Sequence, residues 1–518
     1  MTNKVSGVSR RSFLAAAGAF GAATMAMPRM AVSQDGKVLT VRSYSDLQVL
    51  DPAFRLSLPE DDIIRSIFAP MVNPQPGDTW GWKAVAVDSI EQLDDVTVAF
   101  TLKDNIGFTD GYGQMTAEDV KFSIERFADP ALESPYAGDW SALKEVEVKD
   151  TLSGLIHLKE PFAPLWTSTL PTTTCSILSR AALEQLGGKI GTEPIAQSGQ
   201  YLLTEWVPKQ RTVLKRNPDW AYEPGGFEEI HIIPIEDPAT AELGFEAGDL
   251  DYTWTAVSSI SRLKETPPAG GVVVEKPSLA YVWMGINQDV PPFDNQNIRR
   301  AVQYAIDREA VVDAAYFGAA QTSTGIIAPG LPGHRDANLY NYDPDKAREL
   351  LAQEGATNLS VTLDILNQSE RLTAAQVVQA NLADVGIQCE IKQNDSGTFW
   401  TLGSKDGDYW NKLQLIIGRF SMEPDPSWAT AWFVPDQIGV WNWERFNSPE
   451  FAELHAQGLT EMDPAKRDVI YKKMQDLMEE SGDYVFLTHE VTGVLYRDTV
   501  APGLKPNGEP LLGDFKPA

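Results

Sequence analysis

The feature that most constrains this chain is a repeated alternation of strand-like and helix-like segments along most of its length. Residues 96–102 alternate between side chain types with a β-branched bias, which favours a half-buried strand. Further strands are predicted at residues 38–41, 281–286, 361–366 and 387–391. Apolar side chains at helical spacing predict helices between them. Because the order strand, helix, strand occurs several times, the sequence predicts an α/β architecture with mixed sheets.

Local signals predict where several helices begin and end. Thr116 is followed three residues later by Asp119, which is close to a capping box, so a helix is expected to start there. The other helices are predicted to be capped by Asn297, to run from residue 373 to 383 before Gly386, and to open at Pro464.

An export signal is predicted for residues 1–33. Paired arginines lie in the motif SRRSFL at residues 9–14, an apolar stretch follows at 15–27, and small residues suited to a signal peptidase occupy 31–33. This order is typical of a twin-arginine signal; an amphipathic N-terminus with a chance arginine pair is the alternative. The apolar stretch lacks a following cysteine and is shorter than the about 20 residues of a membrane span. We therefore expect a soluble mature protein that begins near Gln34.

The chain is strongly acidic. Its formal net charge is −29, and removal of the signal with its four basic residues takes it to −33. Such a charge argues against nucleic acid or anionic lipid as a partner and favours solubility outside the cytoplasm. The length exceeds what one small core requires, so roughly two to four lobes are expected.

Signatures of catalysis and of cofactor binding are not found in the sequence. There is no GxSxG motif, no Walker lysine loop and no GxGxxG motif after a strand. The five histidines are far apart along the chain, and none lies in an HExxH motif. No catalytic residue, cofactor or metal site is predicted, although a glycosidase-like pair of carboxylates stays an open alternative. Cys175 and Cys389 either pair or remain free and buried, and the sequence leaves both open.

Several segments carry a resemblance to a known family. The longest are FTLKDNIGFTDG at residues 100–111 with MTAEDVKFS at 115–123, and PFD at 292–294 with IRRAVQYAIDR at 298–308. Shorter ones are DLQVLDP at 46–52, QSGQY at 197–201 and LKRNPDW at 214–220. With these motifs the chain resembles the family 5 extracytoplasmic solute-binding proteins of ABC importers, the oligopeptide, dipeptide and nickel-binding group, over essentially its whole mature length.

This resemblance implies a two-lobed periplasmic binding protein fold of type II, similar to cluster C, with mixed sheets and an extra inserted domain. Lobe I is expected to comprise residues 34–60, 195–280 and 485–518, the inserted domain residues 61–194, and lobe II residues 281–484. The solute is expected between the lobes, which close by a hinge motion. A ligand that gains contacts only in the closed form shifts the population toward closure.

The resemblance also implies ligand contacts in the loop at residues 419–428. In peptide binders the similar loop carries an acid that receives the ammonium group of the peptide. Met422 stands at the matching position here, so either Glu423 takes this role after a small shift or the solute has no free amino terminus. Further candidate contacts in this loop are Arg419, Asp425 and Trp428. The alternative for the two acids is that they only shape a proline-rich turn.

Aromatic residues are the remaining candidates for ligand contact. Trp400, Trp428, Trp441 and Trp443 cluster in the sequence of lobe II. Planar rings cover apolar or sugar surfaces with little loss of entropy, although about two of the four are expected in the core. Tyr44 and Ser45, at the end of the first strand, are candidate contacts from the other lobe or simply part of a turn. Arg371 is a candidate for a ligand carboxylate, with an ordinary helix-start arginine as the alternative, and strict dipeptide specificity is not expected.

Taken together, these features predict a non-enzymatic protein that captures a peptide or peptide-like organic solute. It is expected to act as a monomer in the periplasm after export by the Tat machinery, and to deliver the solute to the membrane permease subunits of an ABC importer. An oligosaccharide, an opine-like conjugate or a chelated metal is the alternative solute. An exported hydrolase and a secreted chaperone-like protein are the alternatives from other classes.

Overall fold

A computed structural model of the protein describes residues 38–518, apart from the side chain of Ser396. The export signal predicted for residues 1–33 lies outside this range. Within it, no helix combines the length and the apolar character that a membrane crossing requires.

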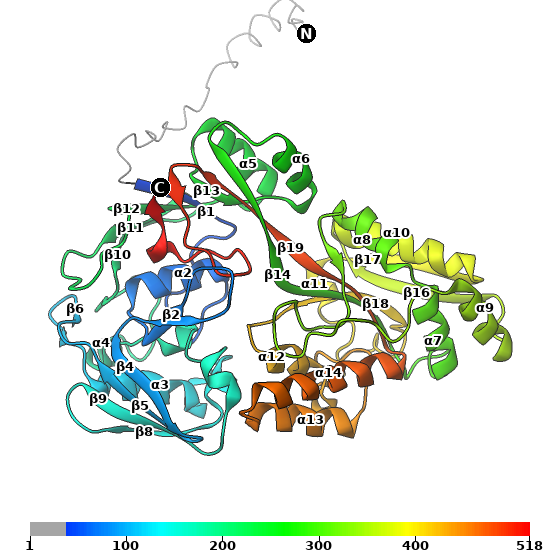
Figure 1. Ribbon diagram of the computed structural model, residues 1–518, viewed down its shortest axis with the longest axis horizontal. Coiled ribbons are helices and arrows are strands. Elements are labelled where there is room, and N and C mark those ends of the chain that lie inside the picture. The colour runs from blue at the N-terminus through cyan, green and yellow to red at the C-terminus, as the bar shows by residue number, and fades with distance from the viewer. Residues whose placement is uncertain (1–37) are drawn as a thin grey trace, which may run out of the picture. The chain divides into compact units, whose positions relative to one another are not determined.

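A mixed sheet of eleven strands is the largest element of the structure (Figure 1). Its spatial order is β10 (Tyr201–Val207), β11 (Arg211–Arg216), β12 (Glu229–Pro234), β1 (Val38–Ser43), β13 (Tyr252–Trp254), β19 (Tyr484–Arg497), β14 (Gly271–Ile286), β18 (Leu415–Ser421), β16 (Leu359–Leu366) and β17 (Ile387–Asn394), with β15 (Gln321–Thr322) paired to β19. Strand β1 is parallel to β12 and β13, and β16 is parallel to β17 and β18. The other pairs are antiparallel, so the predicted mixed α/β architecture is confirmed.

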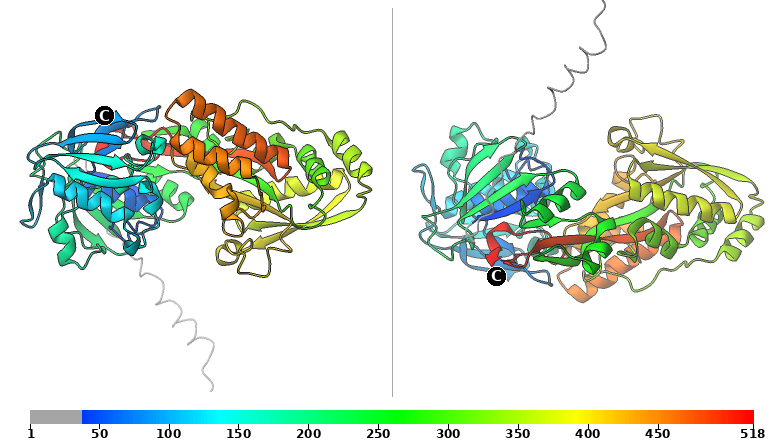
Figure 2. Two further views of the ribbon diagram at one scale, coloured as in Figure 1. Left: turned by 90° about the horizontal axis from the view of Figure 1, so that it is seen from below. Right: turned by 90° about the horizontal axis from the view of Figure 1, so that it is seen from above.

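The two longest strands, β14 and β19, pair with each other in two separate stretches. Residues 271–277 pair with 491–497, and residues 281–285 pair with 484–489, with a register shift between the two stretches. The first stretch continues the sheet through β13, and the second continues it through β18. Figures 1 and 2 show β14 and β19 side by side as they pass from one group of strands to the other.

The remaining strands form smaller sheets. A four-stranded antiparallel sheet has the order β4 (Val87–Asp94), β5 (Thr97–Leu102), β9 (Ser153–Leu158) and β8 (Leu143–Val148). Three two-stranded ribbons pair β2 (Val72–Pro74) with β3 (Trp82–Ala84), β6 (Gly107–Phe108) with β7 (Gly113–Gln114), and β20 (Val500–Ala501) with β21 (Lys516–Pro517).

Helices pack around these sheets (Figure 1). They are α2 (Leu58–Ile67), α3 (Ala117–Ala128), α4 (Arg180–Gln185), α5 (Pro238–Ala247), α6 (Ile260–Glu265), α7 (Gln296–Ala305), α8 (Arg308–Tyr316), α9 (Pro344–Gln353), α10 (Ser369–Asp384), α11 (Ser396–Phe399), α12 (Pro426–Thr430), α13 (Pro449–Thr460) and α14 (Pro464–Ser481).

Buried apolar side chains form several separate cores. One core joins α2 to β1 and β12, and a second joins α3 to β5 and β9. On β14, Val282 and Met284 face a core with α7, α8 and α10, whereas Tyr281 and Trp283 face a core with α13 and α14. This alternation follows from the two-residue period of a strand. The residue boundaries predicted for the lobes stay a prediction, and the one proposed at residue 61 falls within α2.

The local signals for helix ends are partly confirmed. Thr116 and Asp119 form the predicted capping box at the start of α3, and α14 begins at Pro464. Two predicted starts were too late. Helix α7 is capped by Asn295, whose side chain accepts the backbone N–H of Asn297 over 2.8 Å. Helix α10 begins at Ser369. The prediction missed this first turn because its polar residues do not follow the apolar periodicity on which the prediction was based. Both cysteines are free and buried.

Candidate functional site

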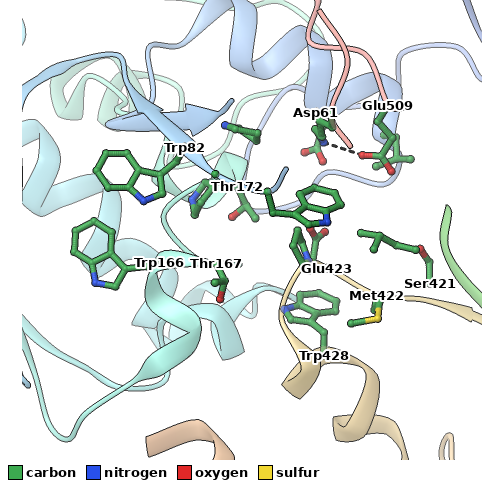
Figure 3. A pocket seen from close by; sticks show the side chains of 18 of the residues that line it. Asp61, Trp82, Trp166, Thr167, Thr172, Ser421, Met422, Glu423, Trp428 and Glu509 are labelled. Atoms are coloured by element: carbon green, nitrogen blue, oxygen red, sulfur yellow. Dashed lines mark hydrogen bonds and ion pairs between the residues drawn. The ribbon is translucent and has the colours of Figure 1, made fainter. Parts of the chain in front are cut away.

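The main candidate site is a cavity of about 480 Å³, which we call the solute cavity (Figure 3). One wall comes from α2, from the β2–β3 ribbon and from residues 166–172. The opposite wall comes from residues 421–428, at and after the end of β18, and Leu279 of β14 also contributes to the lining. Lys505 and Glu509 from the C-terminal segment complete the lining. Segments separated by several hundred residues therefore meet around one space.

Helix α2 directs charged side chains into the solute cavity. Ser57 and Glu60 form a capping box that fixes the start of this helix. Leu58, Asp61 and Arg65 follow at spacings of three and four residues, so they share one face of the helix, and all three line the cavity.

The end of β18 decides which side chains of the opposite wall face the cavity. The backbone N–H of Met422 donates to the carbonyl oxygen of Leu279, and the Met422 side chain, 4% exposed, packs in the core of α13 and α14. The next residue, Glu423, is half-buried, and Figure 3 shows it between Trp428 on one side and Asp61 and Glu509 on the other. Met422 also lines the cavity from its buried position, so despite the one-residue difference from the family pattern an acid, Glu423, is part of the lining.

The carboxylate of Glu423 makes no hydrogen bond or ion pair with any residue in the described part of the chain. Burial raises its pKa above the ordinary value, and the nearby charges of Lys505 and Arg55 only partly oppose this effect. A cation that enters the cavity would stabilise the ionised carboxylate. Glu423 and Trp428 are thus the two predicted site residues that line the solute cavity.

Three other charged residues of the cavity lining, Asp61, Lys505 and Glu509, have ion-pair partners. Asp61 forms an ion pair with the buried Arg55 and accepts a hydrogen bond from Thr173 over 2.8 Å. Lys505 donates to Glu509 over 2.8 Å. Burial is the largest influence and disfavours the charge of Lys505, but Glu509, Asp62 and Glu423 together outweigh it and the lysine pKa is raised. These pairs leave Glu423 as a carboxylate of the lining with no hydrogen-bond or ion-pair partner between residues 38 and 518.

Tryptophans form much of the apolar surface of the cavity. Trp80, Trp82 and Trp166 lie on one wall, and Trp428 lies on the other. The rings of Trp82 and Trp166 are stacked with centroids 5.3 Å apart, and Figure 3 shows them on the same side of the cavity. Sequence reasoning missed these three residues because they lie outside the predicted loop and have no local signal that distinguishes them from core tryptophans.

Asp425 has a different role from the predicted ligand contact. Its carboxylate is fully buried and does not line the cavity. Arg467 donates to both carboxylate oxygens over 3.0 Å, Ser427 donates over 2.6 Å, and Thr167 donates over 2.6 Å. Burial is the largest influence and disfavours the charge, but Arg467 and the hydrogen bonds from Ser427 and Thr167 together outweigh it, so the pKa of Asp425 is lowered. Because protein donors occupy its oxygens, Asp425 holds the loop in place and caps α12.

A second cavity of about 540 Å³ is lined by three more of the predicted candidates, Arg371, Trp400 and Arg419. Arg419 donates to Glu490 over 2.7 Å, and Glu490 also accepts from Arg371 over 2.7 Å. Arg371 is only 3% exposed and donates to the hydroxyl of Tyr316 as well. The guanidinium of Arg371 is therefore held by protein groups, which agrees with the structural alternative rather than with a ligand carboxylate.

The remaining tryptophans of the prediction separate into exposed and buried ones. Trp400 and Trp441 are 38% and 37% exposed, and both pack against the ring of Phe420. Trp443 is 4% exposed and its indole N–H donates to the carbonyl oxygen of Val440 over 2.8 Å, so it is a core residue. Sequence reasoning missed Phe420, the centre of this aromatic cluster, although it lies in the predicted loop.

Tyr44 and Ser45 lie beside the solute cavity without lining it. The hydroxyl of Tyr44 accepts the backbone N–H of Leu58 over 3.2 Å, and its ring stacks on Trp254 with centroids 5.7 Å apart. Ser45 donates to the hydroxyl of Ser57 over 3.3 Å. Both residues therefore support the start of α2, which itself contributes to the cavity wall.

Strand β18 has an open backbone edge next to the solute cavity. It pairs with β14 along its whole length, but β16 pairs only with residues 415–417. Residues 418–421 consequently have a neighbouring strand on one side, and no backbone hydrogen bond to another described residue is found on the other. Arg419 and Ser421 are exposed there. Free peptide groups at a strand edge accept a further extended chain.

A metal centre is not formed by the described residues, because no three His, Cys, Asp or Glu side chains among them gather into a suitable group. Two of the five histidines that are distant in sequence nevertheless meet. The rings of His334 and His489 have centroids 6.3 Å apart.

The comparison with family models decides the classification. Residues 82–438 match the model of the bacterial extracellular solute-binding proteins, family 5. The chain belongs to this family. It is therefore a substrate-binding component of an ABC importer, as the sequence motifs indicated.

Known relatives and solved structures agree with this classification. The glutathione-binding protein GsiB of Escherichia coli (strain K12) is 27% identical over 417 residues, which cover 79% of this chain and 80% of the relative. The periplasmic binding protein DppA of Helicobacter pylori in complex with the peptide STSA has a TM-score of 0.75 and 22% identity, covering 93% of this chain and 98% of that one. NikZ of Campylobacter jejuni in complex with Ni(L-His) has a TM-score of 0.75 and 19% identity, covering 93% and 99%. These structural similarities establish the shared fold.

Proposed function

We propose that this solute-binding protein captures a peptide or peptide-like solute with a free ammonium group, and that Glu423 receives this group. The observation that carries the proposal is the half-buried carboxylate of Glu423, which faces the tryptophan-lined cavity without a partner among residues 38–518. An ammonium group would offset the unfavourable burial of that charge and add a charge-assisted hydrogen bond.

The open edge of β18 favours a solute with peptide groups. Residues 418–421 offer backbone donors and acceptors directly before Glu423. An extended peptide that adds to such an edge gains main-chain hydrogen bonds, while cavities on either side take its side chains. Glutathione and the tetrapeptide bound by the two relatives have the same kinds of groups, which supports this choice of solute.

The test begins with the solute itself. Protein purified from its native export compartment is denatured, and the released small molecules are identified by mass spectrometry. Isothermal titration calorimetry then compares glutathione, the peptide STSA and the N-acetylated form of each. We expect the free amines to bind more tightly than the acetylated forms.

Glu423→Gln tests the assigned role of the carboxylate. We expect this variant to lose about tenfold or more in affinity for the free amine, because hydrogen bonds to charged groups contribute about 1.5–3 kcal/mol, and to bind the acetylated form as the wild type does. Glu453→Gln, at an exposed position of α13, is the matched control. Equal affinities of wild type and Glu423→Gln for the free amine would remove Glu423 from the site.

An oligosaccharide is the second candidate solute, favoured by the four tryptophans of the cavity. Aromatic rings stack on the apolar faces of sugars. Binding of neutral oligosaccharides that is unaffected by Glu423→Gln and lost in Trp428→Ala would support this candidate over a peptide.

The proposal includes the setting in which the protein works. We propose that it acts in the periplasm as a monomer, without turnover of the solute, after export through the twin-arginine route. The paired arginines at residues 10 and 11 support the route. Replacing both by lysine should leave the precursor in the cytoplasm, as cell fractionation would reveal. Light scattering and a turnover assay on the bound solute test the monomer and the absence of catalysis.

A further inference from the structure

Arg65 is a buried guanidinium without an acidic partner at ion-pair distance among the described residues. Its side chain is 9% exposed. Nη1 donates to two neutral oxygens, Oδ1 of Asn73 over 3.0 Å and the carbonyl oxygen of Pro171 over 2.8 Å. Nε is buried and has no partner, and Nη2 makes no hydrogen bond within residues 38–518. Three of the five N–H donors of the guanidinium therefore have no protein acceptor among the described residues.

Nη2 is the part of the guanidinium that a ligand in the cavity can reach, because Nε is buried and Nη1 already donates twice. Arg65 lines the solute cavity, and it also lines an adjoining cavity of about 340 Å³. The adjoining cavity contains three lysines, Lys83, Lys103 and Lys516. Lys83 and Lys516 are ion-paired with Asp514 and Glu223 of the same cavity. Arg65 thus lies where the two cavities meet, and it differs from these lysines in lacking an acidic partner at ion-pair distance.

The nearest acid on the same helix does not neutralise Arg65. Asp62 lies one turn earlier on α2 and makes no ion pair with it. Burial raises the pKa of Asp62 well above the ordinary value, although Lys505 and Arg65 oppose this. A buried cation without an adjacent anion is unfavourable, and an incoming carboxylate relieves this cost. The planar fork of a guanidinium matches the two oxygens of a carboxylate.

We propose that Arg65 binds a carboxylate of the solute, so that the solute cavity selects zwitterions with the ammonium at Glu423 and the carboxylate at Arg65. This assignment rests on the proposed function of the cavity. It names a residue of α2 rather than Arg371, whose donors are occupied by Tyr316 and Glu490. Both the terminal carboxylate of a peptide and the side chain of an acidic residue supply the required group.

The test uses matched libraries of short peptides with free amino termini. One library has free C-terminal carboxylates, a second has C-terminal amides, and a third has C-terminal amides with one glutamate side chain. Calorimetry gives the ratio of affinities for acid and amide forms within each protein. We expect the wild type to prefer a form with a carboxylate by about tenfold or more, as two charge-assisted hydrogen bonds allow. The third library separates a side-chain carboxylate from a terminal one.

Three variants locate the preference. Arg65→Gln should bring the ratio close to one, and Arg180→Gln, which lies at an exposed position, should keep the wild-type ratio. Arg65→Lys retains the charge but not the fork, so an intermediate ratio is expected, and it serves if Arg65→Gln does not fold. Because both affinities in each ratio are measured on the same protein, a general loss of stability in a variant cancels from the ratio.

The outcomes separate this assignment from the proposed function. An unchanged acid preference in Arg65→Gln and Arg65→Lys overturns the role of Arg65 while peptide binding stands. A wild type without any preference for carboxylates overturns the selection of zwitterions in the same way. Failure of the wild type to bind any of the three libraries overturns the peptide proposal and the role of Arg65 together.

Discussion

Thr167 donates a hydrogen bond from its hydroxyl to Oδ2 of Asp425 over 2.6 Å, and this bond joins the two walls of the solute cavity. Thr167 follows a segment whose Leu165 is buried in the core of α3 and β5. Asp425 is fixed to α14 by both of its hydrogen bonds with Arg467. The bond is therefore a direct polar link between two separate cores.

We expect Thr167→Val to weaken solute binding by about tenfold or more. The substitution preserves the shape but removes the hydroxyl that donates to a charged acceptor, an interaction of about 1.5–3 kcal/mol. If the walls meet only when the cavity closes, the loss appears in affinity and little in the melting temperature of the free protein. Calorimetry and thermal melts check this, with the exposed Thr204→Val as control. A Thr167→Val variant with a lower melting temperature but unchanged affinity for the solute would contradict a role of this bond in closure.

Glu423→Gln should raise the melting temperature of the solute-free protein at neutral pH. The pKa of Glu423 is raised by burial in the folded state. A raised carboxyl pKa stabilises the fold below the unfolded value of about 4.3 and loses that contribution as pH rises through the folded pKa. The gain from the variant should therefore be present at pH 7 and diminish toward pH 4. Melts across this range check the prediction, and a variant that is less stable at pH 7 would contradict it.

The titration of Glu423 should also make solute binding depend on pH, and Glu423→Gln tests this as well. As pH falls through the pKa of Glu423, protonation removes the charge that attracts an ammonium group. Wild-type affinity for a free-amine peptide should decline on the acid side, whereas Glu423→Gln should stay flat. Titration calorimetry at several pH values distinguishes the two, and parallel curves would count against the assignment.

Arg371→Met should destabilise the protein by about 2–3 kcal/mol, because it leaves the half-buried Glu490 and the hydroxyl of Tyr316 without a buried donor. Arg419→Met should have a smaller effect, since Arg419 is exposed and Arg371 still pairs with Glu490. Urea unfolding measures both. A larger effect of Arg419→Met would show that the exposed partner, and not the buried one, holds Glu490.

Neither cysteine should react in the native protein. Burial raises the pKa of the Cys175 thiol to about 12 and that of Cys389 to about 12, so almost no thiolate is present at neutral pH. A colorimetric thiol reagent should detect no thiol in the native protein at pH 8 and both thiols in urea. Detection of a disulfide in the non-reduced protein would contradict the free state of both cysteines.

Short-range signals predicted local structure well where interactions between residues close in sequence are sufficient to stabilise it. The capping box of Thr116 and Asp119 depends on groups three residues apart, so it could be read from the sequence. The start of α10 could not be predicted in this way. Its first turns include Arg371, which is buried and donates hydrogen bonds to Tyr316 and Glu490, 55 and 119 residues away in the chain. Apolar periodicity does not report such a buried polar contact.

By itself, the sequence determined the α/β class, the family and the loop that carries Glu423, because periodicity, turns and family motifs are properties of contiguous residues. Only the tertiary structure decided that Glu423 and Met422 line the cavity, whereas Asp425 is buried outside it. It also brought Arg65, Trp166 and Lys505 to the same space. These placements depend on the packing of segments hundreds of residues apart, and no local pattern encodes which side chains meet there.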